Sequence, residues 1–487
     1  MSDADDRPQP PRFTEAFAEF IPRDWAPYPD APAAAFPAAA FTPARRDALG
    51  AAFPGERLVI PAGGLKARNA DCDFTFRADA DFAYLTGLGT DREPDAALVL
   101  EPTADGHVGV LYFKPRAPRT DSAFYADHRY GEMWVGTRES LDDMATLTGL
   151  TCRPIAELPD AVAAGAGATP LRVLRGLDAT LDALVDALRA AHGRPEGPDA
   201  DAGLARHLSE QRLVKDDFEV AELQRACDAT ASAFDGVVAA IGDAVARGRG
   251  ERWIEGVFNL HARHLGNGIG FETIAAAGDH ACTLHWTRND GAVAEGELLL
   301  VDAGVEVDSL YTGDVTRTLP VSGTFTEPQR RVYQAVLDAH AAAIAAARPG
   351  VPHVAIHDAA VRVVAERLHE WGLLPVTVDE ALDPYTGGQH RRWMVHGTSH
   401  HLGLDVHDCG HARSERERGD TLRPGMVVTV EPGLYFKATD LLVPEELRGI
   451  GVRIEDDIVI TADGCRVLSE AIPRTVDAVE AWVQRLR

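Results

Sequence analysis

The stretch LLLVDAGVEVDSLYTGDVTRTLPV, residues 298–321, places Asp302 and Asp314 beside runs of aliphatic and β-branched residues. Such runs favour β-strands, and Asp308-Ser309 between them suits a turn. The stretch therefore predicts a hairpin with one of the two aspartates on each arm. Two antiparallel arms would bring both carboxylates to one wall of the fold, in otherwise apolar surroundings.

Two further acids lie in similar surroundings later in the chain. Glu431 closes the run Met426–Val430, and Glu455 sits between Ile450–Ile454 and the run Ile458–Ile460. An ionised carboxylate that is buried without a partner costs several kcal/mol. Four of them in one region require concentrated positive charge, which two divalent cations would supply. The pattern predicts a dinuclear metallohydrolase.

Each of these residues has a simpler interpretation when it is taken singly. A lone carboxylate is more often solvated or part of a cap, Asp314 could pair with Arg317, and His400 alone is more often structural. We favour the metal interpretation because all five residues share one region with apolar or glycine-rich neighbours. Oxygen ligands with one imidazole suit Mn²⁺, Co²⁺, Fe²⁺ or Zn²⁺. Arg453 lies two residues from Glu455, so on a strand the two share a face, where an arginine can orient a ligand carboxylate.

Histidines gather around His400, in the segment His396–Asp408. The segment contains four histidines, including His407, and another histidine, His285, lies upstream. A pH sensor or adventitious metal binding would also explain such a cluster. We favour catalysis, because a metal ligand with neighbours that can hydrogen-bond a developing oxyanion suits hydrolysis.

Size, charge and cysteine usage limit the class of protein. A chain of 487 residues is too long for one ordinary core and predicts two domains. The net charge of −27 argues against nucleic acid and anionic membranes as partners, since both need a basic footprint. The acidic start is unlike a secretory signal, and no apolar stretch is long enough to span a bilayer. Six scattered cysteines without a Cys-x-x-Cys motif favour a cytoplasmic protein with reduced thiols.

Composition divides the chain into three segments. Residues 1–44 are rich in Pro, Ala and acid and are expected to form a loosely ordered extension. Residues 45–205 alternate apolar runs with helical stretches and predict an α/β domain. Residues 206–487 carry the acids and begin with an amphipathic helix capped by Asp216 or its neighbour, in which the Thr230 hydroxyl can bond back to the preceding turn. The expected strands include Leu58–Ile60, Ala97–Leu100 and Val108–Phe113, and the expected helices include Leu181–Ala191, one that begins with a Thr326/Gln329 capping box and one over about 353–371.

Taken in order, these motifs resemble the metal-dependent peptidases of the pita-bread fold, in the aminopeptidase P and prolidase branch. The C-terminal matches are Leu284-His285-Trp286-Thr287, Val301–Gly304, Gly313–Thr318, His396–Asp408, Val430–Tyr435 and Gly451–Asp457. The N-terminal matches, similar to the amino-terminal domain of aminopeptidase P, are Arg68–Asp71, Phe76-Arg77, Asp81–Gly87 and Glu132–Gly136. The resemblance implies an α/β (α+β) protein in which an N-terminal α/β domain precedes a catalytic pita-bread metallopeptidase domain.

The resemblance also implies a ligand set for two divalent ions, with Mn²⁺ expected. Asp302 and Asp314 would hold one ion. The other would be held by Asp314, His400, Glu431 and Glu455, with Asp314 and Glu455 bridging the pair. The ions would lower the pKa of a bound water toward ~7 and so provide hydroxide for attack on the peptide. Glu431 would also take the water's proton and pass it to the leaving proline nitrogen.

By the same resemblance, His285 and His407 would hold the substrate and stabilise the tetrahedral oxyanion. His396 would support the pocket, and Arg453 is counted with the substrate-binding residues. The implied activity is release of the N-terminal residue from peptides with proline in second position. Proline there makes a tertiary amide, which blocks most peptidases. No residue identified from physical chemistry alone supplies that specificity.

Two other functions are compatible with these motifs. Prolidase, which cleaves Xaa-Pro dipeptides, is the nearest alternative. A non-catalytic member of the same fold is less favoured, because such relatives have typically lost metal ligands and all five are present here. Family members commonly form dimers or tetramers, so we expect a homo-oligomer.

The chain departs from the family pattern at two places. Eleven residues separate Asp302 from Asp314, one more than is usual in the family. An extra residue at the hairpin turn would leave both strand faces unchanged, whereas one within a strand would require a bulge. Ala83 stands where relatives often carry a bulky aromatic residue, which puts capping of the site by a neighbouring subunit in question.

Overall fold

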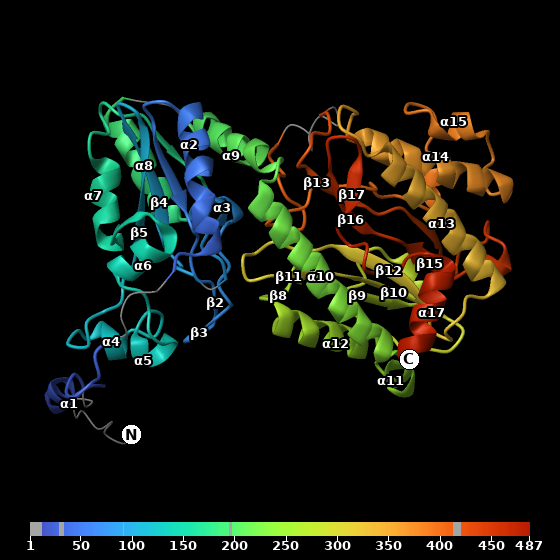
Figure 1. Ribbon diagram of the computed structural model, residues 1–487, viewed down its shortest axis with the longest axis horizontal. Helices are drawn as coiled ribbons and strands as arrows, with labels where there is room; N and C mark the ends of the chain where they lie inside the picture. The colour runs from blue at the N-terminus through green and yellow to red at the C-terminus, as the bar shows by residue number, and fades with distance from the viewer. Residues whose placement is uncertain (1–11, 29–33, 91, 194–196, 413–419) are drawn as a thin grey trace, which may run out of the picture. The chain divides into compact units, whose positions relative to one another are not determined.

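A computed structural model describes residues 12–28, 34–90, 92–193, 197–412 and 420–487 of the chain. The chain divides into two compact units, Met1–Asp201 and Ala202–Arg487. This division and the expected boundary at residue 205 both fall within helix α9 (Pro198–Arg212) (Figure 1).

The N-terminal unit is built on a five-stranded mixed sheet with the order β6-β5-β4-β1-β7. Its strands are β1 (Arg57–Pro61), β4 (Ala97–Thr103), β5 (Gly106–Phe113), β6 (Thr151–Pro154) and β7 (Leu171–Val173), and a small hairpin is formed by β2 (Ala67–Asn69) and β3 (Cys72–Asp73). β4 runs antiparallel to β1 and β5, whereas β6 and β7 are each parallel to their neighbour. The three expected apolar runs are confirmed as strands, and every residue of β1 is buried.

Helices pack on this sheet and complete the core of the N-terminal unit. They are α2 (Thr42–Ala52), α3 (Ala80–Thr86), α6 (Leu141–Thr148), α7 (Leu158–Ala163) and α8 (Ala179–Ala191), with the 3-10 segment η2 (Ile155–Glu157), whereas the short helices α4 (Ala123–Ala126) and α5 (Glu132–Val135) contact each other. Leu181 and Val185 of α8 pack against Val59 and Val99 of the sheet. The expected helix at this position is thereby confirmed, and so is the α/β character of the first domain.

Residues 34–44 differ from the loosely ordered extension that composition predicts. They contain a 3-10 helix, η1 (Pro37–Ala40), and helix α2 already begins at Thr42. The proline at the start of η1 has its backbone constrained in a helical conformation, so the Ala-rich run after it continues as a helix. A further helix, α1 (Glu15–Phe20), has no buried residue. Residues 1–11 and 29–33 of the expected extension lie outside the described residues.

The C-terminal unit contains two three-stranded antiparallel sheets, with the orders β12-β10-β9 and β13-β16-β17. The first consists of β9 (Ile274–Ala277), β10 (Leu298–Ala303) and β12 (Val315–Pro320), and the second of β13 (Val427–Val430), β16 (Asp456–Ile460) and β17 (Cys465–Val467). Two further pairs join β8 (Gly268–Ile269) to β11 (Val305–Glu306) and β14 (Gly433–Phe436) to β15 (Ile450–Arg453). β10, β12, β13 and β16 are buried along their whole length, so polar side chains on them need partners inside the protein.

Long helices pack around these sheets (Figure 1). They are α10 (Asp217–Ala239), α12 (Gly250–Leu265), α13 (Glu327–Ala346), α14 (Val354–Glu370) and α17 (Val476–Leu486), with the shorter α11 (Ile241–Ala246), α15 (Val378–Leu382), η3 (Gly278–Cys282), η4 (Gln389–Arg392) and η5 (Glu445–Leu447). Asp216 caps α10, and Thr326 with Gln329 forms the expected capping box at α13. Both helix starts are therefore confirmed.

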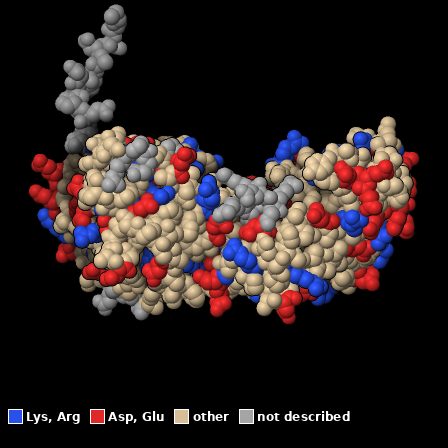
Figure 2. All heavy atoms as spheres, turned by 90° about the horizontal axis from the view of Figure 1, so that it is seen from above, with Lys and Arg blue, Asp and Glu red and all other residues tan. Residues whose placement is uncertain are grey.

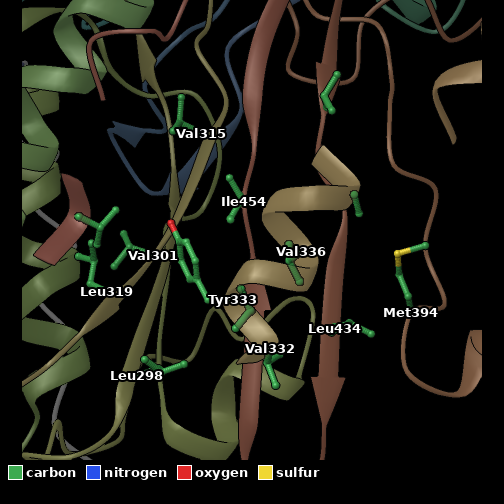
Figure 3. Close-up of a cluster of buried hydrophobic side chains, with 14 of the residues drawn as sticks. Leu298, Val301, Val315, Leu319, Val332, Tyr333, Val336, Met394, Leu434 and Ile454 are labelled. Carbon is green, nitrogen blue, oxygen red and sulfur yellow. The ribbon is translucent and has the colours of Figure 1, made fainter. Parts of the chain in front are cut away.

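Figure 3 shows part of the buried apolar core of the C-terminal unit. Val301 of β10, Val332 of α13 and Ile454, which follows β15, belong to one buried apolar cluster. Successive residues of extended chain face opposite ways. Burial of Val301 and Ile454 in this core therefore directs their neighbours Asp302 and Glu455 away from it.

The hairpin of β10 and β12 keeps one register along its length. Asp302 pairs with Thr316 in the ladder, and Glu306 pairs with Thr312 closer to the turn. The two pairs have the same register, so no residue is inserted within either arm. The additional residue before Asp314 therefore lies in the turn, and both strand faces are preserved.

The turn of this hairpin contains Asp308-Ser309, as expected. The Val307 N–H donates to the Tyr311 carbonyl at 3.0 Å and closes the turn. Leu310 lies in this turn and accommodates the additional residue through a φ of 72°. This value is in the left-handed region, which residues with aliphatic side chains rarely adopt.

Charge and hydropathy of the described residues give no sign of a membrane span. No helix among these residues is long and apolar enough to cross a membrane. On the face shown in Figure 2, lysine and arginine side chains are scattered among acidic ones.

Candidate metal centre

All nine residues singled out in the sequence line one cavity of about 640 Å³ in the C-terminal unit. They are Asp302, Asp314, His400, Glu431, Glu455, His285, His396, His407 and Arg453. Because they come from segments far apart in the chain, tertiary folding brings them together. The cavity also has an apolar part, formed by Phe271, Ile274, Leu284 and Val406.

Asp314 is held by the backbone immediately before β12. Its N–H donates to the Asp457 carboxylate at 2.9 Å. Arg317, the alternative partner of Asp314, donates to Asp456 at 2.7 Å, and both of those side chains are fully buried. The other two nitrogens of Arg317 bond to backbone carbonyls. The simple pairing of Asp314 with Arg317 is therefore not what the structure shows.

Glu431 directly follows β13, and Glu455 lies in the link between β15 and β16. Thr429 donates its hydroxyl to Glu431 at 3.4 Å, and Thr316 donates its hydroxyl to Glu455 at 2.6 Å. The Glu455 N–H donates in turn to the Thr316 carbonyl at 3.1 Å. These bonds orient both carboxylates, but neither threonine carries a charge that would neutralise them.

His400 presents its Nε2 atom to the carboxylates. Its Nδ1–H donates to the His401 carbonyl at 3.1 Å, which leaves Nε2 as the nitrogen that faces the carboxylates. Nε2 lies 3.4 Å from Asp314 Oδ2 and 3.6 Å from Glu431 Oε1. Ligand atoms of Asp314, His400 and Glu455 all lie within 4.8 Å of one another. This spacing allows one ion to contact all three.

Burial raises the pKa of the carboxyl groups around His400. The pKa of Asp314 is raised to about 6 by burial and by the charge of Asp302. Burial and neighbouring carboxylates raise the pKa of Glu431 to about 7 and that of Glu455 well above its ordinary value. Burial lowers the pKa of His400, but Asp314 and Glu431 outweigh it and raise this pKa to about 9. These shifts indicate more negative charge than the local cations balance.

The donor set fits divalent metal ions. It consists of four carboxylates and one imidazole, a combination that Mn²⁺, Fe²⁺, Co²⁺ and Zn²⁺ accept. Asp302 Oδ1 is buried and has no hydrogen-bond partner within the described part of the chain, so one lone pair next to the other carboxylates is unused. Divalent ions would use this oxygen and would remove the cause of the raised carboxyl pKa values.

Arg453 connects the carboxylates to a chain of hydrogen bonds. It donates from NH2 to Asp302 at 2.6 Å, from Nε to Thr316 at 3.1 Å and from NH1 to Tyr435 at 3.1 Å. Each of its nitrogens therefore has a protein partner. Arg453 bonds to the carboxylate of Asp302 and not to that of Glu455, which is nearer in sequence. The reason is that β15 packs against β10.

Tyr435 is a site residue that the sequence did not single out. Its hydroxyl accepts from Arg453 and donates to Nε2 of His396 at 2.8 Å. His396 Nδ1–H donates to the Gly397 carbonyl at 2.5 Å, which sets this tautomer. Burial and then the Arg453 charge lower the pKa of His396 to about 4, so its ring is neutral at neutral pH. The available signal was a tyrosine four residues after Glu431 and between Leu434 and Phe436. A hydroxyl that is buried among apolar residues needs a hydrogen-bond partner.

His285 and His407 lie on the cavity wall near the ligand set. The ring centroids of His407 and His400 are 4.3 Å apart. Burial, followed by the charge of His400, lowers the pKa of His407. A neutral His407 can donate a ring N–H to a carbonyl oxygen. His285 is exposed and lines the same cavity.

Glu251 holds the loop that carries His285, and sequence reasoning missed it. The side chain is fully buried and accepts four bonds, from Ala277 N at 2.9 Å, His280 Nδ1 at 2.7 Å, Trp286 Nε1 at 2.9 Å and Gly291 N at 2.7 Å. The available signal was an acid at a helical interval from Ile254 and Phe258, on the apolar face of α12. A charged residue on such a face needs buried partners.

A buried ion cluster anchors the end of the histidine segment. Asp408, next to His407, pairs with Arg212 at 2.9 Å and with Lys215 at 3.1 Å. Burial alone would raise the pKa of Asp408, but the two cations lower it to about 2. The chain that carries His407 is thus held from behind the cavity.

Two family models match the chain. One is described as "Metallopeptidase family M24" and matches residues 221–462, and the other as "Aminopeptidase P, N-terminal domain" and matches residues 43–171. The first covers the sheets and helices that build the carboxylate site. The chain is a member of the metallopeptidases of family M24.

Similar proteins narrow this class. Xaa-Pro aminopeptidase 1 of Streptomyces coelicolor is 52% identical over 450 residues, which cover 92% of this chain and 88% of the relative. The Xaa-Pro aminopeptidase of Escherichia coli is 34% identical over 450 residues, which cover 89% of this chain and 95% of the relative. The structure of E. coli aminopeptidase P in its low-pH form has a TM-score of 0.80 at 32% identity and covers 92% of this chain and 99% of that one. Within family M24 the chain therefore belongs to the Xaa-Pro aminopeptidases, or aminopeptidase P, and is a metallo-exopeptidase.

The comparisons confirm the expected family, the two-domain pita-bread fold and the enzyme class. They also favour an aminopeptidase over the prolidase alternative, because the relatives that match over nearly the whole chain are Xaa-Pro aminopeptidases.

Proposed function

We propose that the four carboxylates and His400 hold two divalent ions, with Mn²⁺ as the physiological ion. Asp302 and Asp314 would hold one ion. The other would be held by Asp314, His400, Glu431 and Glu455, and Asp314 and Glu455 would contribute to both sites. The single observation that carries this proposal is the convergence of all five side chains on one cavity. Bound ions of this kind polarise a carbonyl group and acidify water.

Glu431 is proposed to move the proton during hydrolysis. Its Oε1 lies 3.6 Å from His400 Nε2 and its Oε2 lies 3.6 Å from His396 Nδ1, so the carboxylate faces the cavity between ligand and substrate residues. In this role it accepts a proton from the attacking water and delivers it to the proline nitrogen as the peptide bond breaks.

His285 and His407 are proposed to donate ring N–H bonds to the substrate carbonyl oxygen, which gains negative charge as the tetrahedral state forms. The lowered pKa of His407 supports this role, because a neutral ring adds no charge that would repel the ligand cations. For Arg453 we propose a positioning role. All of its nitrogens have protein partners, and through Tyr435 it also fixes His396.

The reaction is release of the first residue from peptides with proline in second position. Xaa-Pro aminopeptidases match this chain over most of its length, and a structure of an E. coli aminopeptidase P variant contains substrate. The apolar part of the cavity, with Phe271, Ile274, Leu284 and Val406, can accept an apolar side chain or a proline ring next to the polar ligand set.

Hydrolysis of an Xaa-Pro-Yaa tripeptide, compared with an Xaa-Pro dipeptide in added Mn²⁺, tests this function. We expect release of the first amino acid from the tripeptide. Chelation should abolish this release, Mn²⁺ should restore it, and elemental analysis should find two ions per chain. Activity on dipeptides alone would make the enzyme a prolidase, and full activity after verified metal removal would exclude the metal mechanism.

We also propose a cytoplasmic homo-oligomer, either a dimer or a tetramer. Six free cysteines suit a reducing compartment. Light scattering on the purified protein measures the mass of the assembly, and a monomer at micromolar concentration would contradict this proposal.

A further inference from the structure

A second cavity, of about 320 Å³, adjoins the metal cavity. The two cavities share Leu284 in their walls, and Tyr435 lines the second cavity. On the metal side, Tyr435 bonds to Arg453 and His396. On the other side, the wall continues to Trp393 and Lys437. We call this second cavity the Lys437 pocket.

Hydrogen bonds hold the walls of the Lys437 pocket in place. Asp440 accepts from Arg392 at 2.9 and 2.8 Å and from Trp393 Nε1 at 3.1 Å. This bidentate pair neutralises Arg392. The Ala438 N–H next to Lys437 donates to Asp279 at 2.6 Å, which fixes the backbone from which Lys437 projects.

Lys437 is the cation in this pocket whose charge is not matched by an ion pair. Its Nζ donates to the hydroxyl of Thr283 at 3.3 Å. No carboxylate lies within 4.0 Å of Nζ among the residues that the structure describes. A neutral hydroxyl leaves the positive charge of the ammonium group in place, so the pocket favours an anion.

The reaction indicates which part of a substrate this pocket receives. An aminopeptidase has one residue on the amino side of the bond that it cleaves, and all remaining residues lie on the other side. An additional cavity beside the metal site can therefore bind residues of the leaving peptide. In a tripeptide, that peptide ends in a carboxylate one residue beyond the proline.

We infer that the Lys437 pocket binds the residue after the proline and that Lys437 pairs with a substrate carboxylate there, either the C-terminus of a tripeptide or an acidic third side chain. This inference rests on the proposed function. It makes Lys437 a specificity-determining residue that selects among Xaa-Pro peptides by charge.

Two peptide pairs test the inference. The free acid Ala-Pro-Ala and its amide report on the terminal carboxylate, and the amides of Ala-Pro-Glu and Ala-Pro-Gln report on a side-chain carboxylate. The wild-type enzyme should have a kcat/KM roughly two- to fivefold higher for the charged member of at least one pair at low ionic strength, which is the range of an exposed ion pair. Added salt should reduce the preference.

The variant Lys437→Glu should invert the preference and keep its kcat/KM for the uncharged member of each pair. Arg391→Glu is the matched control, because Arg391 is exposed on the neighbouring η4 and lines neither cavity. This control makes the same change in net charge and should keep the wild-type preference.

Equal ratios in the wild-type enzyme and Lys437→Glu for both peptide pairs would overturn the inference. So would an equal loss for charged and uncharged peptides, which would indicate a structural role. Failure of the proposed function is distinguishable, because the wild-type enzyme would then cleave none of the four peptides, and the inference would fall with it.

Discussion

Glu455 is buried and Glu431 is partly buried, and the hydrogen-bond donors of both carboxylates include threonine hydroxyls. A hydroxyl satisfies an oxygen atom but leaves its charge in place, so burial raises the pKa of both carboxyl groups. At the surface the same residues would need no partner. Their burial is what makes a bound cation necessary.

Replacement of Glu431 by alanine should abolish turnover and leave the fold intact. The variant loses a proposed metal ligand and the proton carrier, and loss of proton transfer alone lowers rates roughly 100- to 10,000-fold. Turnover of a tripeptide in saturating Mn²⁺, together with the melting temperature, measures both effects. Glu446→Ala, an exposed position on η5, is the control. A near-normal kcat in Glu431→Ala would remove Glu431 from the mechanism.

At the scale of the elements, rigid strands place the ligands and helices hold the loops between them. β10 and β12 present Asp302 and Asp314 from one uninterrupted register. α12 reaches the loop of His285 through the four bonds of Glu251. Precision at the site therefore depends on residues that never touch the substrate.

The variant Glu251→Gln tests this positioning role. The amide replaces one acceptor oxygen by a donor, so buried N–H groups of the loop lose their acceptor, at a cost of about 1–3 kcal/mol in unfolding free energy. We expect kcat/KM to fall roughly tenfold at temperatures where the variant is folded, since each tenfold loss corresponds to about 1.4 kcal/mol. Glu255→Gln, on the same helix, should leave both quantities unchanged.

A double-mutant cycle separates positioning from general destabilisation. If Glu251 acts through His285, then Glu251→Gln should cause no further loss of kcat/KM in a His285→Ala background. Additive losses would mean that Glu251 supports the protein without a specific effect on His285.

At the scale of the whole molecule, the acidic site links stability to pH and to metal. Asp314 and Glu431 have carboxyl pKa values of about 6 and about 7, against ordinary values of 3.8 and 4.5. A carboxyl group whose pKa is raised by folding contributes stability that is fully present below about pH 4 and is lost as pH rises through the folded-state value. Repulsion among the negative charges of a chain with a net charge of −27 also lowers the stability of the folded protein as pH rises.

The metal-free protein should therefore lose stability between pH 5 and pH 8. One pKa unit corresponds to about 1.4 kcal/mol, so the loss should amount to a few kcal/mol. Saturating Mn²⁺ should raise the melting temperature most at pH 8. Thermal unfolding of chelated and Mn²⁺-loaded protein across this range measures the effect.

The variant Asp314→Asn with Glu431→Gln is the control for other titrating groups. Without metal it should show a flatter dependence on pH than the wild-type protein, because two of the carboxyl groups with raised pKa values are gone. The same slope in both proteins would place the pH dependence elsewhere.

The sequence by itself identified nine residues that line the cavity, and many of the elements beside them. Aliphatic and β-branched runs predicted the strand that contains Asp302 and the strand that Glu431 follows, because strand formation depends on the residues of the strand itself. The caps at Asp216 and Thr326 were equally readable, because a capping box uses residues only three positions apart. Composition was a weaker guide for residues 34–44, where it predicted a loose extension and the structure has helices η1 and α2.

Tertiary structure alone decided which groups meet. Arg453 bonds to Asp302 across 151 positions of sequence, and Glu251 holds a loop that begins after β9. Thr230, expected to bond within its own helix, accepts the N–H of Val305 at 3.0 Å. Each of these contacts depends on how distant elements pack against one another. A local pattern in a single sequence carries no information about that packing.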